Sequence, residues 1–256
     1  MLNYFDTHAH ILDEKFDEDR SDVIQRIYNN MALTVNIGCN FADCPRTVAL
    51  AEEYEKLYAA VGLHPEDVTT YTEEGWDMLC QLAAHPKVVG IGETGLDYYW
   101  DVSTKDAQKR LFQQHIDLAC QLNKPLIIHD REAHGDTLDI LQHSHARQVG
   151  GILHAFSGSI EMMQEVIKLG FYIGLGGTVT FKNARVPVEV AAAVPLERLV
   201  LETDCPYLTP VPFRGKRNEP LFVRYTAEKI AEIRGISVEE LVEATYQNGK
   251  RIYQIK

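Results

Sequence analysis

LIIHDR (Leu126–Arg131) is the stretch whose pattern decides the fold: three apolar residues are followed by three polar or charged ones. A continuously apolar run is typical of a strand that is covered on both faces, as in a parallel sheet. The stretch GILHAFSG (Gly151–Gly158) repeats the pattern, with a histidine directly after its apolar run. In barrels of parallel strands, chemically active residues lie where the strands end. Both stretches are therefore expected to end at one functional face.

Outward from these stretches, short strand-like runs alternate with longer helical patterns along the whole chain. The expected strands are Leu2–Phe5, Leu33–Ile37, Leu57–Val61, Val88–Ile91, Leu126–Ile128, Gly151–Leu153, Phe171–Ile173 and Arg198–Leu201. The expected helices are Ser21–Asn30, Arg46–Glu55, Glu73–Ala84, Thr104–Leu122, Ala133–Gln142, Ile160–Leu169, Leu221–Arg234 and Ser237–Tyr253. This alternation predicts a (β/α)8 TIM barrel, a single domain over residues 1–256, with an open doubly wound sheet as the alternative. The barrel is favoured because polar residues fall repeatedly at the expected strand ends.

The composition excludes several classes of protein. Of the 256 residues, 45% are hydrophobic and 24% charged, as in ordinary globular domains, and no apolar run is long enough to span a bilayer. The first residues show no secretory signal pattern, and the five cysteines form no CxxC pair, so a cytoplasmic protein with free thiols is expected. The net charge of −12 argues against coating of duplex nucleic acid, although it permits a local basic patch. No obligatory protein partner is indicated.

Histidines and carboxylates at the expected strand ends predict a metal centre. The six candidate ligands are His8, His10, Glu93, His129, His154 and Asp204. His8 and His10 would project together, because residues i and i+2 of a strand face the same side. Burying so many ionisable groups without a cation would be costly. Six ligands exceed the needs of one tetrahedral ion with an open position, and they suit two divalent ions that share a carboxylate. Such a mixed donor set favours Zn, Mn, Fe or Co over Mg, and the sequence does not choose among them.

The remaining histidines are interpreted separately. His64 also follows an expected strand, and we expect it to contact substrate, with a metal ligand or a core residue as alternatives. The others lie within or beside helical patterns and are expected to be solvated: His85, His115, His134, His143 and His145.

Six motifs in order make the sequence resemble the TatD-type deoxyribonucleases, metal-dependent hydrolases of the amidohydrolase superfamily. They are DTHAH (Asp6–His10), GLHP (Gly62–Pro65), GIGETGLDYY (Gly90–Tyr99), PLIIH (Pro125–His129), HAFSG (His154–Gly158) and ETDCPY (Glu202–Tyr207). The resemblance covers essentially the whole chain, and it also includes NGKR (Asn248–Arg251), which resembles the closing segment of the family.

This resemblance implies a barrel with two divalent metal cations per chain and a partition of their ligands. His8, His10, Glu93 and Asp204 would hold the first ion. Glu93, His129 and His154 would hold the second, so that Glu93 would bridge the two. Family members act on DNA, some as 3′→5′ exonucleases, which makes the ends of nucleic-acid strands the expected substrate.

Cations and aromatic residues near the strand ends favour a phosphate-containing substrate. The stretch PFRGKRN (Pro212–Asn218) places Arg214 and Arg217 in the loop after the last strand, and Arg131 lies two residues after His129. These arginines could bind phosphate, although a solvated loop is the alternative reading of the last-strand loop. The aromatic residues Tyr98–Trp100 could stack on a base or pack against the rim.

Together these features predict a metal-dependent phosphodiesterase that trims nucleic acid. Asp204 is the expected general base, and Glu202 is either a substitute base or a partner of a ligand. The alternative in another reaction class is a deacylase or amidohydrolase that acts on a small ester, amide or lactone. A metal-binding protein without catalysis is a third possibility.

Overall fold

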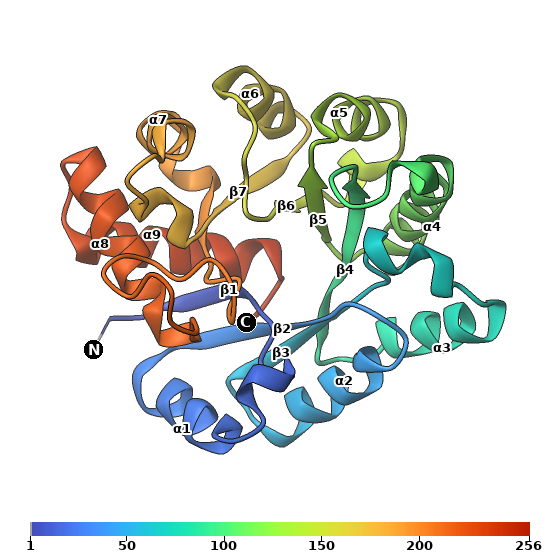
Figure 1. The fold of residues 1–256 in the computed structure, drawn as a ribbon, viewed down its shortest axis with the longest axis horizontal. Helices are drawn as coiled ribbons and strands as arrows, with labels where there is room; N and C mark the ends of the chain where they lie inside the picture. The colour runs from blue at the N-terminus through green and yellow to red at the C-terminus, as the bar shows by residue number, and fades with distance from the viewer. Residues whose placement is uncertain (1) are drawn as a thin grey trace.

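Eight parallel strands in sequential order, β1 to β8, form the centre of the molecule in a computed structural model that describes residues 2–256 (Figure 1). The strands are β1 Phe5–Ala9, β2 Leu33–Gly38, β3 Leu57–Val61, β4 Val88–Asp97, β5 Leu126–Arg131, β6 Gly151–Leu153, β7 Phe171–Leu175 and β8 Leu199–Leu201. Backbone bonds join the residues after β8 to β1 and close the ring, among them Asp204 N–H to His8 C=O (2.9 Å) and His10 N–H to Cys205 C=O (2.8 Å). This order confirms the (β/α)8 barrel and excludes the open doubly wound sheet.

Helices surround the strands on the outside of the ring (Figure 1). They are α1 Arg20–Asn30, α2 Asp43–Glu53, α3 Glu73–Ala83, α4 Lys105–Leu122, α5 His134–His143, α6 Ile160–Lys168, α7 Arg185–Ala193, α8 Val223–Arg234 and α9 Val238–Ile252. Short 3-10 helices lie between them at Glu14–Phe16, Pro65–Thr70, Val102–Thr104, Ala146–Gln148, Gly177–Thr180, Leu196–Arg198 and Pro220–Phe222. None of the helices in residues 2–256 is both long and apolar enough to cross a bilayer.

Two elements were missed or misplaced by the sequence-based expectation, and β4 extends to Asp97 instead of ending at Ile91, so that Glu93 lies inside the strand. Helix α7 was not expected, because its sequence combines Pro187 with β-branched valines, which are poor helix formers. Strand β1 is Phe5–Ala9 rather than Leu2–Phe5, so Asp6, Thr7 and His8 lie inside a fully buried strand. The polar content of this strand hid its true position, and the same polar residues make it part of the site.

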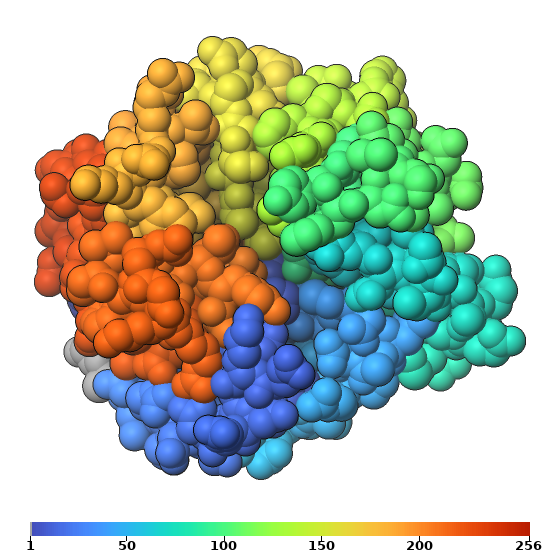
Figure 2. Space-filling model, viewed as in Figure 1, coloured from blue at the N-terminus to red at the C-terminus, as the bar shows by residue number. Residues whose placement is uncertain are grey.

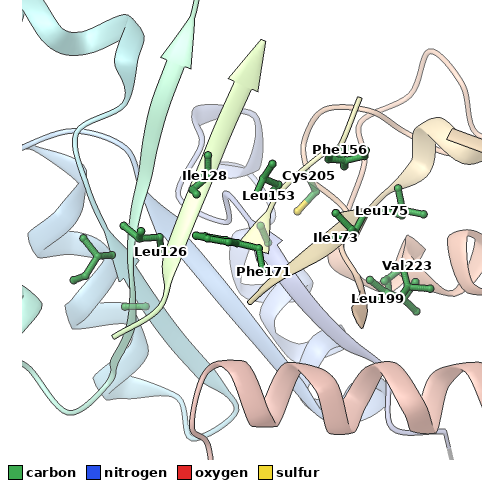
Figure 3. Packing of buried hydrophobic residues seen from close by; sticks show 14 of the residues in the cluster. Leu126, Ile128, Leu153, Phe156, Phe171, Ile173, Leu175, Leu199, Cys205 and Val223 are labelled. Carbon is green, nitrogen blue, oxygen red and sulfur yellow. The ribbon is translucent and has the colours of Figure 1, made fainter. Parts of the chain in front are cut away.

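Side chains that alternate along the strands fill two layers. Leu126, Ile128 and Leu153 belong to one buried cluster that includes residues of the surrounding helices, and Figure 3 shows them on β5 and β6 near Phe171. The residues between them, Ile127 and Ile152, belong to a second cluster that includes residues of most other strands and the end of α9. The second cluster fills the ring toward the amino ends of the strands. Polar side chains therefore occupy the opposite, carboxyl end.

His115 is a correction to the sequence analysis, because it is fully buried in α4 rather than solvated. Its Nε2 accepts the backbone N–H of Leu63 (3.0 Å), and its Nδ1 donates to the carbonyl of Leu111 (2.9 Å). Burial lowers the pKa of His115 to about 4, so the ring is neutral and able to accept that bond. His143 and His145 are exposed as expected, whereas His85 and His134 are half-buried.

Candidate metal centre

A pocket of about 820 Å³ lies at the carboxyl ends of the strands. Its walls include His10 after β1, Glu93 in β4, His129 in β5, His154 after β6 and Asp204 after β8. Figure 2 shows a hollow near the middle of this face, bordered by the blue segment that follows β1 and the orange segment that follows β8. The structure thus brings the six candidate ligands, which are spread from residue 8 to residue 204, to one end of the barrel.

Four of the six side chains form a first donor group. The Nε2 atoms of His8 and His10 are 3.2 Å apart, and Oε2 of Glu93 lies 3.1 Å from the former and 3.8 Å from the latter. Oδ1 of Asp204 lies 3.7 Å from Nε2 of His8 and 3.3 Å from Nε2 of His10. Donors placed tetrahedrally around an ion 2.0–2.1 Å away would be about 3.4 Å apart. The four side chains therefore fit one divalent cation.

A second donor group forms around the other oxygen of Glu93. Oε1 lies 2.8 Å from Nδ1 of His129 and 2.7 Å from Nε2 of His154, and these two nitrogens are 3.4 Å apart. Nε2 of His64 lies 3.4 Å from the same oxygen. The two carboxylate oxygens of Glu93 thus face two different sets of nitrogens, and His64 stands at the edge of the second set. This donor set also suits a divalent cation.

A carboxylate lies behind each ring of the second group, and one of the two carboxylates was absent from the sequence-based site. Oδ2 of Asp97 lies 2.9 Å from Nε2 of His129, opposite the nitrogen that faces Glu93. Such a carboxylate fixes the tautomer and the orientation of a ligand histidine. Asp97 follows Glu93 by four residues in β4, and in a strand this spacing places both side chains on one face. That spacing was the signal available in the sequence.

Glu202 occupies the corresponding place behind His154. It is fully buried, Oε1 accepts the N–H of Ala155, and the same oxygen lies 3.8 Å from Nδ1 of His154. A Cβ atom on Gly174 would lie 2.3 Å from Oε2 of Glu202, so β7 carries glycine where this carboxylate needs space. Within residues 2–256, Oε2 of Glu202 and Nδ1 of His154 have no hydrogen-bond partner.

The protonation states of the centre follow from burial and from neighbouring charges. Burial alone would raise the pKa of Glu93, but the electrostatic effect of the surrounding imidazoles, that of His154 first, holds it well below its usual range. Burial lowers the pKa of His8 to about 4, which leaves this ring neutral and able to bind a cation. Burial raises the pKa of Glu202 to about 7. The centre therefore offers an ionised central carboxylate. The ring of His129, whose pKa is raised to about 10 by its bonds to Asp97 and Glu93 against the effect of burial, must lose a proton when a cation binds.

The four expected substrate contacts have different locations. His64 and Arg131 line the pocket, whereas Arg214 and Arg217 do not. Arg217 makes two bonds to the carboxylate of Asp19 (2.6 and 2.7 Å). The guanidinium of Arg214 lies 3.8 Å from the centre of the Phe181 ring. The structure does not bring these two arginines to the site, because Arg217 pairs with Asp19, which precedes α1, and Arg214 lies over Phe181, which follows β7.

A closed barrel of parallel strands with this cluster of histidines and carboxylates at its carboxyl end defines the class of metal-dependent hydrolases. The family model described as "TatD related DNase" matches residues 5–254. The chain belongs to the TatD family of metal-dependent hydrolases.

Relatives of known sequence extend over the whole chain. A Bacillus subtilis protein named "Uncharacterized metal-dependent hydrolase YabD" is 48% identical over 252 residues, which cover 98% of this chain and 99% of that protein. A Citrobacter rodentium protein named "3'-5' ssDNA/RNA exonuclease TatD" is 32% identical and covers 98% of each chain. The solved structure of YJJV, a TatD homologue from Escherichia coli, superimposes with a TM-score of 0.90 at 29% identity, over 99% of this chain and 98% of that one.

Proposed function

We propose that this chain is a phosphodiesterase that binds two divalent cations and removes nucleotides from the 3′ ends of single-stranded or frayed DNA. The observation that carries the proposal is the carboxylate of Glu93, whose two oxygens face two separate donor groups. Two cations at these positions would activate a water and neutralise the negative charge that develops on the phosphoryl oxygens. The relative named as a 3′-5′ exonuclease supports this choice of substrate.

The residues of the chain take separate roles in this proposal. His8, His10, Glu93 and Asp204 hold the first cation, and Glu93, His129 and His154 hold the second. Asp204 is partly exposed to the pocket, so its carboxylate is placed to accept the proton of the attacking water. Glu202 is buried behind His154, and we assign it to the orientation of that ring rather than to proton transfer.

His64 and Arg131 are the proposed contacts to the phosphodiester. Nε2 of His64 lies at the edge of the second donor group, within reach of a phosphoryl oxygen bound there. Arg131 lines the pocket and forms no ion pair among residues 2–256. Arg214 and Arg217 lie outside the pocket walls, so we propose that they contact only longer strands.

One observation favours a second candidate function, hydrolysis of a small uncharged ester, amide or lactone. The pocket walls carry seven carboxylates and a single arginine: Asp13, Asp43, Glu66, Asp67, Glu93, Asp130, Asp204 and Arg131. Carboxylates repel a polyanion unless cations or other partners compensate for them. A small neutral substrate would not meet this repulsion.

One experiment separates the two functions. Protein reconstituted with Zn, Mn, Co, Fe or Mg is assayed on end-labelled single-stranded DNA, RNA, a nitrophenyl phosphodiester and lactones, with each DNA end blocked in turn. We expect stepwise cleavage of DNA that stops when the 3′ end is blocked, and metal binding that saturates near two ions per chain. Cleavage that ignores a 3′ block would exclude the exonuclease. Turnover of lactones without any cleavage of DNA would establish the second candidate, and saturation at one ion would exclude the two-metal site.

A further inference from the structure

Two aromatic side chains are exposed beside the metal centre, in the segment that follows β4. Tyr99 is 49% exposed and Trp100 63% exposed, whereas their neighbour Tyr98 is buried and donates its hydroxyl to Asp136. Trp100 lines the pocket. Packing against the barrel rim therefore accounts for Tyr98 but not for the exposed ring of Trp100. A large apolar side chain that stays in water at the wall of a pocket is available to a ligand.

Arg131 joins these two rings into one surface. Its guanidinium lies 3.8 Å from the centre of the Tyr99 ring and 5.4 Å from the centre of the Trp100 ring. Contacts of this kind hold the planar guanidinium in place while its N–H groups stay free for an anion. Arg131 is also the only arginine or lysine in the pocket wall formed by residues 2–256. One cation thus stands next to one exposed indole ring.

The position of this surface is fixed relative to the metal centre by Asp97. Its Oδ1 accepts the backbone N–H groups of Tyr99 (2.9 Å) and Trp100 (3.3 Å). Its Oδ2 holds Nε2 of His129. A single buried carboxylate therefore holds both the aromatic segment and a ligand of the second donor group, so a phosphate at the centre and a base on Trp100 would belong to one nucleotide chain.

We propose that Trp100 and Arg131 form a nucleobase subsite for single-stranded nucleic acid. The base next to the scissile phosphate stacks on the indole ring, and Arg131 binds the phosphate of the same nucleotide. Stacking requires only the flat face of a base, so the subsite accepts all bases and requires an unpaired strand. This inference rests on the proposed nuclease function, which it deepens by assigning what holds the strand.

The first test removes the base from the substrate and the ring from the protein in turn. Wild type, Trp100→Ala and Trp100→Phe are compared on oligothymidylate and on the same strand with an abasic residue next to the scissile phosphate. Loss of stacking is expected to lower kcat/KM roughly 5- to 100-fold. Wild type should show this loss of kcat/KM when the abasic strand replaces oligothymidylate. Trp100→Ala should cleave the abasic strand as well as wild type does. Trp100→Phe should recover most of the wild-type activity on oligothymidylate. An equal loss for Trp100→Ala on both strands would overturn the subsite.

Tyr28→Ala is the matched control. Tyr28 is also an exposed aromatic residue (47%) with a cation, Lys56, 5.0 Å from its ring centre, but it lies in α1 and outside the pocket walls. Its removal should leave kcat/KM on both strands unchanged.

The second test measures binding of the strand independently of its cleavage. The chain has two tryptophans, so Trp76→Phe leaves Trp100 as the only one. Oligothymidylate should quench the fluorescence of Trp100, and the abasic strand should quench it less. Lack of quenching would overturn the subsite even if DNA is cleaved. Quenching without cleavage would instead contradict the proposed nuclease function and support the base-binding site.

Discussion

At the scale of single residues, the centre depends on Glu93. Its carboxylate is almost fully buried, and nitrogens of five histidines lie within 4 Å of its oxygens: His8 and His10 at one oxygen, His64, His129 and His154 at the other. A buried negative charge in that position offsets the mutual repulsion of two cations.

Glu93→Gln keeps the shape of the side chain and removes its charge. We expect this variant to retain its fold, to bind less than half of the wild-type metal and to lose activity by orders of magnitude. Elemental analysis, circular dichroism and the diester assay measure these three properties. His143→Ala, on an exposed helix position, should match wild type within about ±0.5 kcal/mol of stability. Near-normal turnover of Glu93→Gln would show that Glu93 does not bridge two ions.

Asp97 provides a second test at this scale, since its carboxylate contacts the ring of His129 and the backbone of Tyr99 and Trp100. Asp97→Ala leaves His129 without the partner that orients its ring, and we expect 10- to 100-fold weaker binding of one of the two ions. Titration of the metal-free protein with Zn or Co separates the two affinities. Affinity for both ions at the wild-type level would show that Asp97 serves only the backbone of Tyr99 and Trp100.

At the scale of elements, the end of β3 is held by α4 through a single imidazole. The N–H of Leu63 points to Nε2 of His115, and Leu63 precedes His64. A neutral histidine is required, because a protonated ring has no acceptor for this N–H. The position of the pocket residue His64 therefore depends on a residue that is buried between helix and strand.

This requirement makes stability depend on pH. His115 has a pKa of about 4 in the folded protein against about 6.5 in an unfolded chain, so the unfolded chain binds more protons between these values. The stabilising effect is complete above pH 6.5 and is lost as the pH falls toward 4. When the pH falls from 7.5 to 5, we expect the free energy of unfolding to decrease by about 2 kcal/mol more for wild type than for His115→Gln.

Urea unfolding at the two pH values measures this difference, and the other titrating groups cancel in the comparison. His143→Ala should show the wild-type dependence on pH. An identical loss of stability in wild type and His115→Gln would show that the imidazole is not the source.

At the scale of the whole molecule, charge and shape restrict the substrate. The chain carries a net charge of −12, and most of its surface repels phosphate. The site lies in a hollow at one end of the barrel, where a strand end can enter more easily than a continuous duplex (Figure 2). Few cationic side chains line the pocket to compensate for the negative charge of the phosphates that enter it.

Binding of single-stranded DNA should therefore depend only weakly on salt. Each phosphate contact contributes about −0.7 to the slope of log K against log salt, and Arg131→Ala should make the slope shallower by about that amount. Arg214→Ala with Arg217→Ala should change binding of short strands less than Arg131→Ala does. Fluorescence anisotropy from 50 to 300 mM salt gives these slopes. Equal affinity for blunt duplex and single strand would contradict the preference for unpaired ends.

The barrel and its donor residues were determined by local patterns in the sequence. Apolar runs such as Leu126–Ile128 define buried strands, and a parallel barrel places all strand ends at one face. The six histidines and carboxylates could be chosen on that basis alone. Strand β1 and helix α7 were misplaced or missed because their local composition opposes the structure they adopt.

Tertiary structure alone decided which atoms face one another. Arg217 pairs with Asp19, which is 198 residues away, and the N–H of Leu63 binds His115, 52 residues away. The two oxygens of Glu93 are divided between donor groups from five different strand ends. A sequence pattern shows the face on which a residue lies, whereas its partners depend on packing between distant segments. For this reason the sequence predicted the centre and Arg131, and only the folded chain selected Asp97 and His115 and separated Arg131 from Arg214 and Arg217.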